Sequence, residues 1–104
     1  MRYFYCDISN NNIKRTEADG NLGDILKEFY YLSETDGSFF GLENKDKQIL
    51  QFAWEVKEVW LIDIPIKGTK NSLSKRSDYD ECVNLIKYFY NGGEILSLKG
   101  FEYK

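Results

Sequence analysis

Apolar and polar residues alternate along several stretches of the chain, which is the pattern of β-strands that bury one face. Strands are predicted over residues 2–8, 38–43, 48–54 and 58–66, with residues 13–18 as a candidate short partner of the first. Turns are predicted at the polar segments 9–12, 44–47 and 55–57. Links this short favour an antiparallel meander over parallel crossovers.

The segment QFAWEVKEVWLIDIPI holds both tryptophans and the only proline of the chain. Alternation divides it into two strands joined near residues 55–57. Phe52 and Trp54 share one face of the first strand, and Trp60 shares one face of the second with its neighbouring isoleucines. These faces are expected to meet the helices, so the tryptophans are predicted to lie in the core. Asp63 is expected on the opposite face, which is open to solvent or to a partner.

Two segments change to the helical period of 3.6 residues. The apolar positions of the first are Leu22, Ile25, Leu26 and Phe29. Those of the second are Cys82, Val83, Ile86, Phe89 and Tyr90. Asn21 is the predicted N-cap of the first helix, which should run to about Leu32. Asp78 and Glu81 predict a capping box for the second helix, and the glycines of residues 91–93 its end.

Residues 67–77 are predicted to form a basic loop, and residues 94–104 a last strand. The expected order is therefore β(β)-α-β-β-β-α-β. The fold class that follows is α+β, with a mostly antiparallel sheet of about five strands and two helices packed on one face. At 104 residues, and without a compositional break or repeat, the chain is expected to be a single α+β domain over residues 1–104.

Composition and charge exclude several functions. There are 14 bases and 17 acids, a net charge of −3, which argues against direct binding to nucleic-acid phosphates. No apolar run is long enough to span a bilayer, and the N-terminus lacks the apolar stretch of a signal peptide. Cys6 and Cys82 are expected to be buried thiols in a reducing cytoplasm, although a disulfide between them stays open.

Catalytic and metal-binding motifs are missing. The chain has no histidine, so neither a Ser–His nor a Cys–His pair can form, and histidine metal sites are excluded. A Ser–Lys pair within residues 72–75 would lie in the predicted loop. Paired carboxylates could act on glycosides or bind Mg²⁺, but they are better explained as solvated charges at strand ends. The candidates for such pairs are Glu43, Glu55, Glu58 and Asp63. No enzyme, cofactor or metal is predicted.

The distribution of charged residues along the chain is more informative about function than the search for motifs. Between residues 17 and 36 there are six acids against one base, Lys27, and a second acidic group begins at Asp78. These acids can be a solvated helix face, or a negative surface that steers and docks a basic protein. The residues predicted to bind such a partner are Glu17, Asp19, Asp24, Glu28, Tyr31, Glu34 and Asp36.

The stretches FFGLENKDKQILQFAW, VWLIDIPI and LIKYFYNGG make the chain similar to a known family over roughly residues 21–101. They resemble the small immunity proteins of bacterial contact-dependent growth inhibition and other polymorphic toxin systems. The resemblance implies a cytoplasmic protein that binds and neutralises one cognate toxin domain, often a nuclease, by occluding its active site or a neighbouring surface. It implies no catalytic residue, no contact with a membrane and no chemistry by the immunity protein itself.

The alternative function is a small ligand-binding or regulatory α+β module, in which Trp54 and Trp60 line an aromatic pocket.

Overall fold

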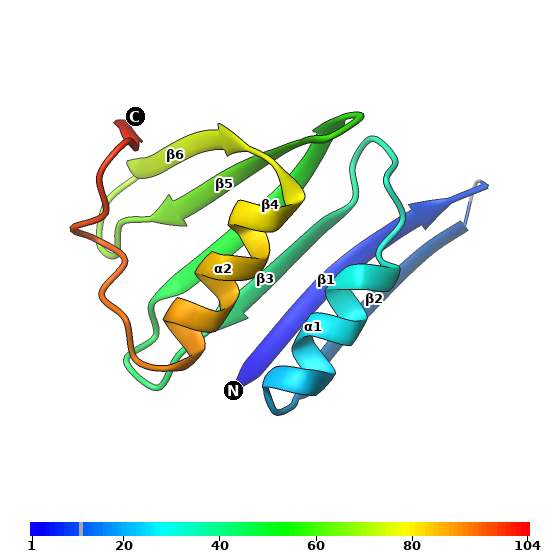
Figure 1. Cartoon of the computed structure of the whole chain (residues 1–104), viewed down its shortest axis with the longest axis horizontal. Helices are drawn as coiled ribbons and strands as arrows, with labels where there is room; N and C mark the ends of the chain where they lie inside the picture. The colour runs from blue at the N-terminus through cyan, green and yellow to red at the C-terminus, as the bar shows by residue number, and fades with distance from the viewer. Residues whose placement is uncertain (11) are drawn as a thin grey trace.

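A computed structural model describes residues 1–10 and 12–104. Within them, one antiparallel sheet of seven strands carries two helices on one face (Figure 1). The strands are β1 (Arg2–Ser9), β2 (Asn12–Asp19), β3 (Phe39–Glu43), β4 (Ile49–Val56), β5 (Val59–Pro65), β6 (Ser72–Ser77) and β7 (Glu102–Tyr103). The helices are α1 (Leu22–Tyr31) and α2 (Tyr79–Tyr90). The α+β class, the antiparallel sheet and the pair of helices are confirmed.

The strand count and the order of elements differ from the prediction. In the part of the chain that the structure describes, the sheet has seven strands rather than about five, in the spatial order β2-β1-β3-β4-β5-β6-β7. The predicted loop at residues 67–77 contains β6, and the predicted C-terminal strand is reduced to the two residues of β7. The segment between α2 and β7 runs past the β6 edge of the sheet without regular structure (Figure 1).

Strand β6 forms although its sequence is polar, because neighbouring elements hold its charged side chains. Lys75 lies 2.7 Å from Glu81 of α2, and Arg76 lies 2.7 Å from Glu55 of β4, on the other face of the sheet. The hydroxyl of Ser77 also donates a hydrogen bond to Glu81. The Ser–Lys pair predicted in a loop therefore lies in a strand, where the ammonium group of Lys75 is already paired.

The core lies between the sheet and the helices, and Phe29 of α1 is at its centre. The Phe29 ring centroid lies 4.9 Å from Trp60 and 5.4 Å from both Phe40 and Phe52. Trp60 is 2% exposed, so its predicted place in the core is confirmed. Trp54 is half-buried and packs against the edge of this core.

The predicted helix ends are largely confirmed. Asn21 and Asp24 form a reciprocal capping box at the start of α1. The Asp78 side chain accepts a hydrogen bond from the Glu81 backbone at 2.8 Å, but the Glu81 carboxylate turns to β6 instead of completing the predicted box. Gly92 follows α2 with a φ of +90°, the left-handed conformation that suits glycine.

Two further sequence predictions concern a turn and the cysteines. The turn predicted at residues 9–12 includes Asn11, which lies outside the described residues. Cys6 and Cys82 are both buried and free, so the disulfide alternative is wrong. Burial raises the pKa of Cys82 to about 12, and its thiol therefore stays protonated at neutral pH.

Candidate partner-binding surface

The predicted partner-binding residues do not lie on one surface. Glu17 and Asp19 belong to β2, where they stand opposite Phe4 and Arg2 of β1. Since the alternate β1 residues Tyr3 and Tyr5 are buried beneath the helices, these two acids lie on the uncovered sheet face. Asp24, Glu28 and Tyr31 lie on α1, and Glu34 and Asp36 in the loop that follows it.

Two of these acids have local partners that explain them without a binding role. Glu17 lies 3.0 Å from the Arg2 guanidinium group. Asp24 accepts a hydrogen bond from the backbone N–H of Asn21 at 3.1 Å and so caps α1. Glu28 faces the sheet closely enough that its charge adds to the effect of burial in raising the pKa of Tyr3. The remaining predicted residues lie toward the C-terminal end of α1.

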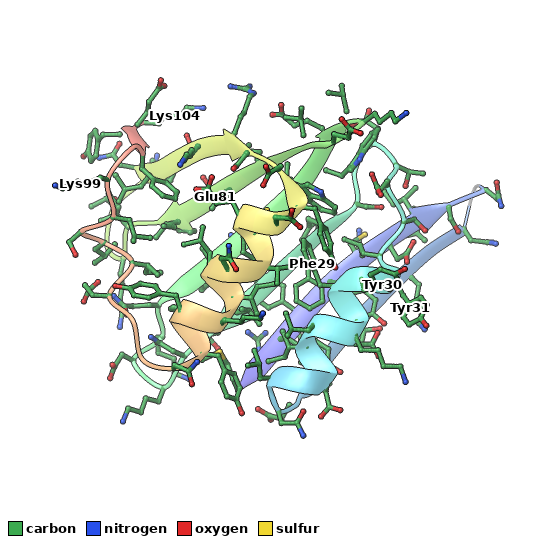
Figure 2. The ribbon with its side chains drawn as sticks, viewed as in Figure 1. Phe29, Tyr30, Tyr31, Glu81, Lys99 and Lys104 are labelled. Atoms are coloured by element: carbon green, nitrogen blue, oxygen red, sulfur yellow. The ribbon has the colours of Figure 1, made fainter. Side chains whose placement is uncertain are left out.

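At that end of the helix layer, acids and aromatic residues from four segments come together. We call this the acidic–aromatic surface. Its centre consists of Glu34, Glu58, Asp78, Tyr79 and Asp80, and Tyr30, with Tyr31 packed against it, lies at its margin. A shallow depression in it is lined by the four carboxylates and Tyr79, and Trp60 also contributes to the lining. Figure 2 shows Tyr30 and Tyr31 projecting outward from the end of α1, while Phe29 points inward.

Each acid is positioned by a different structural device. The Glu34 carboxylate accepts a hydrogen bond from the Trp54 indole N–H at 3.2 Å. Asp78 is the N-cap of α2. Asp80 lies in the first turn of that helix, where its negative charge interacts favourably with the helix dipole. Glu58 occupies the tight turn between β4 and β5 with a φ of +67°, a conformation in which glycine or asparagine would be less strained.

The ring of Tyr79 lies at the bottom of this surface. Its ring stacks on that of Phe29, with centroids 5.2 Å apart and an interplanar angle of 2°. Burial raises the pKa of Tyr79, and the nearby Tyr30, Asp80 and Glu34 raise it further. Burial is the main cause of this shift, and the smaller contributions of Asp80 and Glu34 agree with their placement around Tyr79.

The negative charge of this surface is not compensated by ion pairs. Within residues 1–10 and 12–104, no salt bridge involves any of its four carboxylates. Lys57 precedes Glu58 in the chain, yet it too forms no salt bridge in the described structure. Glu81 lies in the same helical turn as Asp78 and Asp80, but it points away from them to Lys75. The cluster therefore leaves net negative charge at the surface of the described structure.

A larger groove of about 900 Å³ lies at the other end of the helix layer. The turn between β3 and β4, the N-terminus and the end of α2 line it. Its bases are Arg2, Lys45, Lys47 and the terminal amino group, and its acids are Asp19, Glu43, Asp46 and Glu94. Since the two signs balance, this groove has no preference for a basic or an acidic partner.

The carboxylates that the sequence suggested for chemistry are separated. Glu43 lies 3.1 Å from Arg2, Glu55 lies 2.7 Å from Arg76, and Glu58 belongs to the acidic–aromatic surface. Asp63 lies on the uncovered sheet face, opposite Gln51 and Ser74. In the described part of the chain, no three Cys, Asp or Glu side chains are grouped to hold a metal ion.

The residues predicted for partner binding include Tyr31 and Glu34 of this surface, but not those that α2 and the β4–β5 turn contribute. The acidic start of α2 was visible as a signal, yet nothing in the pattern joined it to the end of α1.

Among the described residues, neither helix combines the length and apolar character needed to span a membrane. No family model matches the chain, and neither the comparison with curated proteins nor that with solved structures finds a match.

Proposed function

We propose that this chain is a cytoplasmic bacterial immunity protein, which binds and neutralises a cognate toxin domain through its acidic–aromatic surface. The observation that carries the proposal is a set of four carboxylates that form no salt bridge with any residue the structure describes, with exposed tyrosines nearby. The resemblance of the sequence stretches to immunity proteins suggests the biological role, and the charge of the surface suggests where a partner would bind.

The charge of the surface favours a basic partner, and a nuclease is the kind of toxin that fits best. A nuclease binds phosphates in a positively charged cleft. Carboxylates placed at that cleft, or beside it, would interact with the same positive charges as the phosphates do and would keep nucleic acid out. Complementary charge of this kind mainly raises the association rate and the specificity, so it suits a protein that must capture a toxin quickly.

The tyrosines would supply most of the binding energy. Tyr30 is 69% exposed and Tyr31 is 67% exposed, and their rings pack edge to face with centroids 5.2 Å apart. Tyrosine is enriched among the residues that dominate binding energy, because it buries a large area at a small cost in side-chain entropy. Mutual packing holds these two rings in place before a partner arrives.

Co-purification with the toxin domain tests this function. If the gene immediately upstream encodes a large secreted protein, its C-terminal domain should be co-expressed with the tagged chain and assayed for toxicity. We expect a stable complex, and growth of cells that would die from the toxin domain alone. If the upstream product is not toxic, or if it kills cells equally well with and without this chain, the proposed function is wrong.

The ligand-binding alternative makes a different prediction, because both tryptophans border the same surface. Trp60 contributes to the lining of the depression, and the Trp54 N–H is bonded to Glu34. A small molecule bound there would change the tryptophan emission spectrum. A metabolite screen that shifts this spectrum, together with no effect on any toxin, would favour the regulatory module.

A further inference from the structure

Strand β2 is a long edge of the sheet that no other element of the described structure covers. It has eight residues, and most of them are exposed, including Ile13 at 63%. The opposite edge of the sheet is different, because β6 is paired there with β7 and the chain end. An unpaired edge of this length is a template for another strand, and most proteins blunt or cover such edges.

The hydrogen-bond pattern identifies the backbone groups of β2 that face outward. Met1 and Gly20 exchange both of their backbone hydrogen bonds, each 3.0 Å long. Because bonded and non-bonded pairs alternate along an antiparallel ladder, the register makes Ala18 and Thr16 bonded to β1 as well. The N–H and C=O groups of the intervening odd-numbered residues therefore point away from the sheet. They belong to Ile13, Arg15, Glu17 and Asp19.

From these groups we infer that two copies of the chain pair through β2, antiparallel, about a twofold axis at Thr16. In this register Arg15 of each copy stands opposite Glu17 of the other, twice in the interface. Ile13 stands opposite Asp19, and all of these residues have outward-facing backbone groups. Moving the axis to Arg15 would bring two arginines together, and moving it to Glu17 would bring two glutamates together. A register centred on Glu17 would set Arg15 opposite Asp19 as well, but of these three registers only the one centred on Thr16 forms opposite-charge pairs without placing like charges at the axis.

The other contacts of this register are compatible with the pairing. The two Thr16 side chains meet as a non-bonded pair, the arrangement in which side chains lie closest, and Thr–Thr pairs are favourable there. Glu17 already contacts Arg2 through one carboxylate oxygen, and its second oxygen can accept from a partner's arginine. The dimer would be a continuous sheet, with the two acidic–aromatic surfaces left free.

Sedimentation velocity on the untagged chain, from about 10 µM to about 1 mM, tests the pairing in the range expected of a small interface. We expect a monomer–dimer equilibrium that high salt weakens. The variants R15E and E17R should each weaken the homodimer at least tenfold, because each places like charges opposite each other. An equimolar mixture of R15E and E17R should dimerise again, since every acid then faces a base.

Recovery in the mixture separates a lost interface from a damaged fold, since a misfolded chain would not recover. Hydrogen exchange of the wild-type chain adds a second measurement, in which the Arg15 and Glu17 amides should become protected as concentration rises. A monomer at every concentration would overturn the proposal and leave the edge to a strand of a different protein. A dimer that both variants leave unchanged would overturn it too, because that dimer would use another surface. None of these results depends on a toxin.

Discussion

The two ends of the helix layer hold similar numbers of acids, yet they differ in charge. In the large groove, Asp19, Glu43, Asp46 and Glu94 are accompanied by bases and by the N-terminal amino group. On the acidic–aromatic surface, Glu34, Glu58, Asp78 and Asp80 are not in salt bridges with any described residue. Counting acids along the sequence would not distinguish these two regions.

The two ends also differ in what lies beneath them. Tyr79 stacks on Phe29, which is 1% exposed and contacts three other rings, those of Phe40, Phe52 and Trp60. The groove rests partly on the glycines that end α2 and on the exposed turn between β3 and β4. A partner-binding surface built on a rigid core loses less entropy on binding than one built on turns. The larger hollow is therefore the weaker candidate for a docking site.

Phe29→Ala should have the largest effect, since it removes the ring that joins both helices to the sheet. We expect the free energy of unfolding to fall by about 3–5 kcal/mol, measured by urea denaturation followed by circular dichroism. The matched change at the groove end, Gly92→Ala, should cost only about 1 kcal/mol, from forcing alanine into a left-handed conformation. Equal losses in the free energy of unfolding would show that the core packs equally well beneath both ends of the helix layer.

Tyr31→Ala should weaken toxin binding by about 2 kcal/mol, or roughly thirtyfold, if this ring is a central contact. Because Tyr31 is 67% exposed, stability should change by less than about 0.5 kcal/mol. Tyr88→Ala, near the groove end, is the control, and its affinity should match that of the wild type. Isothermal titration calorimetry measures both. A greater loss of affinity for Tyr88→Ala would move the contact to the groove.

Salt should weaken toxin binding, because the proposed contact depends on charge. Raising the ionic strength from about 0.05 M to about 0.5 M shortens the screening length several-fold, and we expect affinity to fall about tenfold. Stopped-flow measurements should place most of this loss in the association rate. Affinity that is independent of salt would indicate an apolar contact, such as the uncovered face of the sheet.

The substitution Glu81→Gln should have the smallest effect on the free energy of unfolding. It compares an acid that forms a salt bridge with neighbouring acids that form none in the described structure. The hydrogen bond from Lys75, followed by that from Ser77, lowers the Glu81 pKa below its ordinary value of 4.5. A lowered pKa contributes stability that is complete above the ordinary value and is lost as pH falls through the folded-state value. Glu81→Gln should therefore reduce stability most at neutral pH, and the loss should shrink as pH falls below the ordinary value of 4.5, as urea midpoints would show.

Asp80→Asn is the control for that comparison, since Asp80 lies one residue from Glu81 but is in no salt bridge in the described structure. Its substitution should leave the acid dependence of the urea midpoint close to that of the wild type. If Asp80→Asn flattens the profile as much as Glu81→Gln does, the contact between Lys75 and Glu81 is not the cause.

The sequence predicted those elements whose own side chains determine them. The helical period of α1 and α2 and the alternation in β4 and β5 are local patterns, so they were read correctly. Strand β6 has one large apolar residue, Leu73, and it forms because Glu55 and Glu81 hold its bases from elsewhere in the fold. Contacts between residues far apart in the chain leave no periodic signal, so the predicted loop was wrong.

The same limit applies to the candidate site. Tyr31 and Glu34 could be selected because they lie near each other in an acidic stretch. Asp80 joins them only because α1 and α2 pack side by side on the sheet. Glu58 lies in the turn at residues 57–58, which the sequence predicted slightly early at residues 55–57, but nothing in that local pattern placed the turn beside the start of α2.

We propose that the acidic–aromatic surface, and not the groove, meets a basic toxin domain. The most direct test is to compare the dissociation constants of the toxin complex for Asp80→Lys and Asp46→Lys. Both acids are exposed, and no salt bridge of the described structure includes either one. We predict at least tenfold weaker binding for Asp80→Lys and a change within about twofold for Asp46→Lys. Weaker binding for Asp46→Lys with no change for Asp80→Lys would contradict this account.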